Sequence, residues 1–143
     1  MTLSPQGEPV PFGDEALLHA ARLARLNAWC PYSGFQVGCA ILDGNGRIHS
    51  GANVENASYG LTICAERSAF FSAVVAGARE IRRVVIVTDA GKPTPPCGAC
   101  RQVLAEFGLG FQVGLAGISG QVMEWHQMAD LLPHAFTFDA PKT

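Results

Sequence analysis

The sequence predicts an α/β fold, namely a three-layer α/β/α domain around a mixed five-stranded sheet whose last two strands form an antiparallel hairpin. Helical and strand patterns alternate in the order helix, hairpin, helix, strand, helix, hairpin. The run RRVVIVT is typical of a strand that is buried on both faces. The 143 residues match one domain with a real core. We therefore expect a single domain over residues 14–138, with a flexible leader at 1–13 and a C-terminal tail at 139–143.

The composition narrows the classes of function. The net charge is −2 and the pI is about 6.0, so no global positive field attracts nucleic acid. We see neither a secretory signal nor an apolar run that could span a bilayer. Five cysteines, an odd number, argue against a disulfide framework. These features predict a cytoplasmic protein that binds neither nucleic acid nor membranes.

The first half of the chain reads as a helix followed by a hairpin. A helical pattern starts at Asp14, and we expect Pro31 to stop it. Residues 35–42 have the length and composition of a strand, and residues 47–52 would be its return strand. The DGNG segment between them strongly favours a hairpin turn, because Gly and Asn tolerate positive φ.

A polar loop, NVENASYG, separates this hairpin from two further helices. The pattern from Cys64 to about Arg79 predicts a largely buried helix, and residues 82–88 form the central strand candidate. The segment DAGKPTPP breaks the chain before a helix over residues 97–107, which Gly108 ends.

The last elements predict the antiparallel hairpin. Residues 111–116 and 121–125 have strand patterns, and only the segment GISG joins them. A connection this short excludes a parallel pair, which needs a crossover of a dozen or more residues. Residues 127–133 complete the order as a short helix.

The motifs CAER and PPCGACRQ predict a zinc site. Cys64 and Cys97 fall at helix starts, where free N–H groups favour thiolate, and Cys100 lies on the same side of its helix as Cys97. Three protein ligands leave a fourth zinc position for water, and Glu66 should project near that position as a proton carrier.

Two alternatives compete with this interpretation. A lone CxxC pair is also typical of redox sites, although Cys64 and Glu66 disfavour that here. A structural zinc cage would need a fourth cysteine, either Cys30 or Cys39, and Cys39 lies in an apolar strand run.

With these motifs and PYSGFQVG, NVENASYG and LLPHAF, the chain resembles the cytidine deaminase family, in its small-subunit form with an all-cysteine zinc site. The resemblance covers residues 14–138. It implies that Cys64, Cys97 and Cys100 bind one Zn²⁺ per subunit. Zinc-activated water would attack C4 of the cytosine ring, and Glu66 would carry protons to ring N3 and the leaving amine. The implied reaction converts cytidine and 2′-deoxycytidine to uridine and 2′-deoxyuridine with release of ammonia, as in pyrimidine salvage.

The resemblance also implies how the substrate is held. Asn53 and Glu55 would hydrogen-bond the ribose hydroxyls, and Phe35 would pack against the base. Ala65 and Pro95 would contribute to base binding, where Pro95 replaces the usual Ser or Thr but keeps a backbone carbonyl for the amine. The family is typically a homotetramer whose sites borrow residues from neighbouring subunits. Ala57, Tyr59 and Phe136 match the positions that a neighbouring subunit contributes to the site. Arg67 matches a residue that hydrogen-bonds the cysteine ligands in the family.

Other functions remain to be separated from nucleoside deamination. A deaminase of a related nucleoside analogue would have the same zinc site, but the intact NVENASY loop disfavours it. Deaminases that act on bases within nucleic acid have a parallel arrangement of the last strands, whereas an antiparallel hairpin is expected here. A non-catalytic, zinc-stabilised binding module has no use for an acid two residues after a ligand, so Glu66 argues against it.

Overall fold

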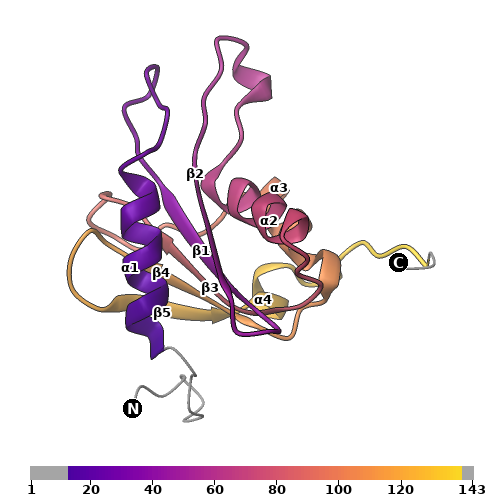
Figure 1. The fold of residues 1–143 in the computed structure, drawn as a ribbon. Helices are drawn as coiled ribbons and strands as arrows, with labels where there is room; N and C mark the ends of the chain where they lie inside the picture. Colours follow the sequence, from indigo (N-terminus) through magenta and orange to yellow (C-terminus); the bar gives the residue numbers. More distant parts are fainter. Residues whose placement is uncertain (1–12, 140–143) are drawn as a thin grey trace.

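The computed structural model describes residues 13–139 as a mixed five-stranded sheet covered by helices on both faces (Figure 1). The strand order is β2-β1-β3-β4-β5, in which only β3 and β4 pair in parallel. The elements are α1 (Gly13–Arg25), β1 (Gly38–Asp43), β2 (Ile48–Ala52), a 3₁₀ turn η1 (Tyr59–Leu61), α2 (Ala65–Val75), β3 (Ile81–Val87), α3 (Gly98–Leu104), a 3₁₀ turn η2 (Ala105–Phe107), β4 (Gln112–Ala116), β5 (Val122–Gln127) and α4 (Met128–Leu131). The predicted α/β class and the antiparallel last hairpin are confirmed.

Alternate residues of the central strands enter two separate cores. Ala40 and Leu42 of β1 pack with α1, whereas Cys39 and Ile41 face the opposite layer. That opposite core contains apolar side chains of α2, α3 and α4, with Leu131 at its edge. Strand β3 divides in the same way, which explains why its sequence lacks polar alternation.

Two glycines allow the helices to lie close to the sheet. A Cβ atom on Gly38 would lie 2.0 Å from the carbonyl oxygen of Ala21 in α1. A Cβ atom on Gly51 would lie 2.3 Å from the backbone nitrogen of Ala69 in α2. The distance between each helix and its strand therefore depends on the missing side chain, and the second contact sets the position of α2 over the sheet.

Three predicted boundaries are wrong by several residues. Helix α1 ends at Arg25 rather than near Pro31, and β1 begins at Gly38 rather than at Phe35. Helix α2 ends at Val75 instead of Arg79, because Gly77 adopts a φ of 102° that stops the helix.

The early end of α1 follows from long-range pairing. The backbone nitrogen of Trp29 donates to the carbonyl of Asn53 at 3.0 Å, and its carbonyl accepts from the nitrogen of Glu55 at 2.7 Å. The chain therefore leaves the helix to pair with the segment after β2. As a result, residues 26–37 and 53–64 project side by side from one end of the sheet (Figure 1).

The predictions for the two ends of the chain can be compared with the structure only in part. Residues 1–12 and 140–143, assigned to the leader and the tail, lie outside the described residues, while Gly13 belongs to α1. Within residues 13–139, no helix is both long and apolar enough to cross a membrane.

Candidate zinc centre and active-site cavity

The three predicted zinc ligands occupy the ends of two helices. Cys64 is the N-cap residue of α2, and Cys97 is the N-cap residue of α3. Cys100 follows within the first turn of α3 and is buried. Both helix starts therefore direct free backbone N–H groups toward the region of the sulfurs, which stabilises thiolate there.

The spacing of the sulfurs fits a tetrahedral zinc ion. Cys64 Sγ lies 3.9 Å from Cys97 Sγ, which lies 3.4 Å from Cys100 Sγ, and all three lie within 4.8 Å of one another. Zinc–sulfur bonds of ~2.3 Å place the sulfurs of a tetrahedral site about 3.8 Å apart. The cluster has this size without rearrangement of the helices.

The cluster has exactly three candidate ligands among residues 13–139. Neither Cys30 nor Cys39 joins it, so these residues do not build a closed four-cysteine cage. Cys39 is fully buried in the core, and all five cysteines are free thiols rather than disulfides. The arrangement leaves one tetrahedral position for a non-protein ligand, as in catalytic zinc sites.

Arg67 lies beside the first ligand. Its Nη2 is 3.5 Å from Cys64 Sγ and 3.5 Å from the carbonyl oxygen of Thr62. A hydrogen bond from the Cys100 thiol and the nearby Arg67 guanidinium lower the pKa of Cys64 to about 5, although partial burial opposes them. These contacts favour the thiolate form of Cys64, the form in which all three cysteines would bind the metal.

Glu66 combines burial with a position next to the cluster. It lies in the first turn of α2, and only 5% of its surface is exposed. Burial raises the pKa of its carboxyl group, and the negative charge of Cys64 adds to this effect. A raised pKa makes this carboxyl group a stronger base than an exposed carboxylate, which suits a group that must take up and release a proton.

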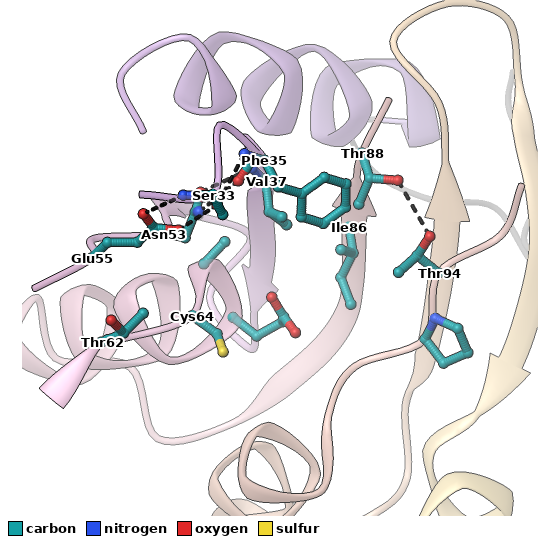
Figure 2. A pocket seen from close by; sticks show the side chains of 13 residues that line it. Ser33, Phe35, Val37, Asn53, Glu55, Thr62, Cys64, Ile86, Thr88 and Thr94 are labelled. Atoms are coloured by element: carbon teal, nitrogen blue, oxygen red, sulfur yellow. Dashed lines mark hydrogen bonds between the residues drawn. The ribbon is translucent and has the colours of Figure 1, made fainter. Parts of the chain in front are cut away.

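A cavity of about 260 Å³ connects Glu66 with the projecting loops. Figure 2 shows Asn53 and Glu55 at one end, Thr88 and Thr94 at the other, and Phe35 between them. Of the predicted substrate-binding residues, five line this cavity: Phe35, Asn53, Glu55, Ala65 and Pro95. Cys64 and Glu66 also line it, so the structure places the cluster and the acid at the same cavity.

The far carboxylate differs from Glu66 in its surroundings. The Ser33 hydroxyl donates to Glu55 and has the largest effect, which lowers the pKa of this carboxyl group; desolvation opposes it, and the backbone N–H groups of Ser33 and Tyr32 lower the pKa further. Glu55 is therefore held as an anion. The neighbouring Asn53 donates from Nδ2 to the carbonyl of Phe35 at 2.8 Å and accepts from the nitrogen of Val37 at 2.9 Å.

Three of the predicted substrate-binding residues do not line the cavity within one chain. Ala57 and Tyr59 belong to the projecting loop, where Tyr59 is 74% exposed. Phe136 follows α4 and is 72% exposed, although its carbonyl accepts a hydrogen bond from Gln102. The described part of the chain does not bring these side chains to the cavity it builds.

Sequence reasoning missed six residues that line the cavity: Ser33, Val37, Thr62, Ile86, Thr88 and Thr94. One signal was available, because Phe35 and Val37 are two residues apart just before β1 and both line the cavity, whereas Ser33 lies in the preceding turn, next to Gly34 with a φ of 70°. No comparable pattern marks Thr88 and Thr94, which come together only because the loop after β3 folds back. The hydroxyl of Thr88 donates to that of Thr94 at 3.4 Å.

Comparisons with known proteins agree with this site. Residues 13–113 match the family model described as "Cytidine and deoxycytidylate deaminase zinc-binding region". The chain belongs to the cytidine deaminase family. It is 48% identical over 124 residues to a cytidine deaminase of Halalkalibacterium halodurans, an alignment that covers 86% of this chain and 93% of that protein.

Other relatives extend the likeness to sequence and structure. A cytidine deaminase of Sporosarcina psychrophila is 46% identical over 124 residues, with 86% of this chain and 90% of that protein covered. The crystal structure of cytidine deaminase from Burkholderia pseudomallei superimposes with a TM-score of 0.80 at 47% identity. That match covers 85% of this chain and 98% of the other. The three-cysteine cluster is therefore a zinc site of this family.

Proposed function

We propose that this chain catalyses the zinc-dependent hydrolysis of cytidine and 2′-deoxycytidine to uridine and 2′-deoxyuridine, with release of ammonia. The observation that carries the proposal is a buried acid, Glu66, that lines the same cavity as the zinc ligand Cys64 and the anionic Glu55. We further propose that the catalytic unit is a single domain over residues 14–138, working in the cytoplasm, where reduced thiols persist.

Each residue at the metal end has a stated task. Cys64, Cys97 and Cys100 would hold Zn²⁺, which when bound lowers the pKa of a water molecule and acts as a Lewis acid. Glu66 would accept a proton from that water and deliver it to ring N3. Glu66 would then take the second proton from the hydroxyl now bonded to C4 and give it to the exocyclic amine, so that ammonia leaves as the C4–N bond breaks and the C4=O bond of the product forms.

The remaining residues would bind the nucleoside. Asn53 and Glu55 would hydrogen-bond sugar hydroxyls, and the Phe35 ring would pack against the base. Main-chain groups of Ala65 and Pro95 would meet polar atoms of the base. These roles follow from the family resemblance, and the position of all five residues along one cavity supports them.

We propose that Arg67 tunes the metal end. Three thiolates around Zn²⁺ leave a formal charge of −1, which would weaken the ion's acidifying effect on water. A guanidinium within 3.5 Å of Cys64 Sγ offsets part of this charge.

We also propose that the active form is a homotetramer in which Ala57, Tyr59 and Phe136 complete neighbouring sites. Support comes from the exposure of Tyr59 and Phe136, together with that of the apolar Phe71 and Val75 on α2. Exposed aromatic and aliphatic groups of this size are typical of surfaces that bind another protein.

A free nucleoside fits the cavity better than a nucleotide or a nucleic acid strand. Among the described residues that line it, none is Lys, Arg or His, so no cation is placed to bind phosphate. Strand β5 is antiparallel to β4. In deaminases that act on polynucleotides, the corresponding strands are instead arranged in parallel.

The direct test is to measure zinc content and the loss of ultraviolet absorbance of cytidine with the same purified sample. We expect one zinc per chain, and turnover of cytidine and 2′-deoxycytidine but not of their 5′-monophosphates. Full zinc occupancy without turnover of any pyrimidine nucleoside would instead indicate a non-catalytic zinc-stabilised module. Preferential turnover of the monophosphates would show that the substrate class is wrong.

A further inference from the structure

The Ser33 hydroxyl connects the two parts of the cavity that would bind the nucleoside. Its Oγ donates a hydrogen bond to Glu55 Oε2, at the sugar end. The same Oγ accepts from the backbone nitrogen of Phe35 at 3.0 Å. Figure 2 shows Ser33 between Glu55 and Phe35 at the wall of the cavity. One hydroxyl therefore contacts both the anion and the backbone of the aromatic wall.

The hydrogen bonds of Glu55 leave it little spare capacity. Its Oε1 accepts from the backbone nitrogens of Tyr32 at 3.0 Å and Ser33 at 3.1 Å. An ionised carboxylate has about four acceptor sites, so three of them are occupied in this arrangement. The remaining one is on Oε2, the oxygen whose direction the Ser33 hydroxyl sets.

The Phe35 backbone is held from both sides by the residues of the sugar end. Its nitrogen donates to Ser33, and its carbonyl accepts from Asn53 Nδ2 at 2.8 Å. Gly34, between Ser33 and Phe35, has a φ of 70°, and its nitrogen bonds to the carbonyl of Cys30 at 2.9 Å. Ser33 is thus presented by a closed turn, which limits how far its hydroxyl can move.

We propose that Ser33 is a positioning residue for the deamination reaction. It orients the free acceptor site of Glu55 toward a sugar hydroxyl and ties that carboxylate to the Phe35 wall. This inference rests on the proposed function, since it assigns a partner to the sugar-binding carboxylate. The lowered pKa of Glu55, to which the Ser33 hydroxyl contributes most, agrees with a carboxylate that must stay ionised to accept.

A purely structural role for Ser33 makes a different prediction from a positioning role. If Ser33 only stabilises the turn, loss of its hydroxyl would lower kcat/KM for every substrate to the same degree. This loss would add to the effect of removing Glu55. A positioning hydroxyl acts only through Glu55 when a sugar hydroxyl is present. The two roles are separated by a double-mutant cycle and by the choice of nucleoside.

The experiment measures kcat and KM for cytidine with wild type, Ser33→Ala, Glu55→Ala and the double variant. We expect Ser33→Ala to lower kcat/KM roughly 5- to 30-fold, mainly through KM, because one charge-assisted hydrogen bond is lost. The double variant should be within about 3-fold of Glu55→Ala alone. Ser33→Thr, which keeps the hydroxyl, should recover most of the loss, and Ser119→Ala in the β4–β5 turn is the matched control for removal of an exposed serine.

A second substrate makes the result decisive. With 2′,3′-dideoxycytidine, which lacks the 2′ and 3′ hydroxyls and keeps the 5′ hydroxyl, Ser33→Ala should change kcat/KM less than about 3-fold. Additive losses in the cycle, or an equal loss with the dideoxynucleoside, would overturn the positioning role even if each variant keeps its zinc. A wild-type protein that does not turn over cytidine would overturn both proposals, whereas an active wild type with additive losses would overturn only the role of Ser33.

Discussion

Glu66 and Glu55 line the same cavity, yet their environments shift their pKa values in opposite directions. Glu66 is buried at the start of α2, where desolvation raises its pKa. Glu55 lies on a projecting loop, where the Ser33 hydroxyl and two backbone N–H groups lower its pKa. The chemical group is identical, so the difference comes entirely from the surroundings.

This contrast matches the two tasks proposed for the carboxyl groups. A proton carrier must gain and lose a proton during each turnover, which requires a pKa closer to neutral pH than that of a free carboxyl group. A group that accepts a hydroxyl hydrogen must stay ionised throughout. The helix and sheet core provide the first environment, and a turn rich in N–H and O–H donors provides the second.

The largest effect on activity is expected at the buried carboxyl group. Glu66→Gln keeps the size of the side chain but cannot carry protons, so kcat should fall at least ~10²-fold. Zinc measured by atomic absorption should remain at one per chain. Near-normal turnover by a zinc-loaded variant would contradict the role of Glu66.

Removal of Arg67 tests the charge balance at the same end. Arg67→Ala should lower kcat roughly 10- to 100-fold and loosen zinc, as is usual for partners that hydrogen-bond a metal ligand. The measurement is kcat together with a zinc competition titration. Arg67→Lys keeps the positive charge and should be less affected, and unchanged kcat and zinc affinity in Arg67→Ala would place this residue outside the metal centre.

A substitution at the exposed end of the cavity should change substrate binding rather than the chemical step. Glu55→Ala removes a charged acceptor, so we expect kcat/KM for cytidine to fall about 10- to 100-fold, chiefly through KM. Free cytosine should be a poor substrate for the wild type. Efficient deamination of cytosine, or a loss confined to kcat, would mean that the two carboxylates do not divide the work as proposed.

In the proposed tetramer, residues of neighbouring subunits would cover the exposed end of the cavity, where Glu55 lies. We expect a solution mass near four times 15.1 kDa by light scattering. Phe136→Ala should lower kcat/KM by a smaller factor, about 5- to 20-fold, while the zinc content stays unchanged. A monomer that is fully active at nanomolar concentration would contradict the borrowed residues.

The smallest effect on activity is expected at a third carboxylate, which lies outside the cavity. Asp43 is almost completely buried, and burial alone would raise its pKa. Hydrogen bonds from His49, at 2.8 Å, and from the backbone nitrogens of Arg47 and Asn45 outweigh burial and hold the pKa of Asp43 below its usual value. Burial therefore raises a carboxyl pKa only where donors do not replace the lost water.

The test at Asp43 is the pH dependence of stability. A carboxyl group whose folded pKa lies below its unfolded value of about 3.9 contributes stability above that pH and loses it as the pH falls. Asp43→Asn should cost about 1–3 kcal/mol of unfolding free energy at pH 7 and leave kcat unchanged. The difference from wild type, measured by urea unfolding, should shrink below about pH 4, and a difference independent of pH would show that Asp43 does not act through its charge.

Features that depend on local spacing could be predicted from the amino-acid sequence. The order of elements follows from periodicity, and the four-residue GISG link requires β4 and β5 to be antiparallel. Cys64, Cys97 and Cys100 fall at helix starts, so their grouping could be expected from the motifs.

Features that depend on contacts between distant segments could not be predicted from the sequence and follow from the folded chain. Helix α1 ends at Arg25 because Trp29 pairs with the segment after β2, and that pairing also brings the turn with Ser33 to Glu55. Thr88 and Thr94 reach the cavity only through the fold of the loop after β3. The opposite pKa shifts of Glu55 and Glu66 have the same origin, because desolvation and hydrogen bonding depend on which residues surround a carboxyl group in space rather than on its neighbours along the chain.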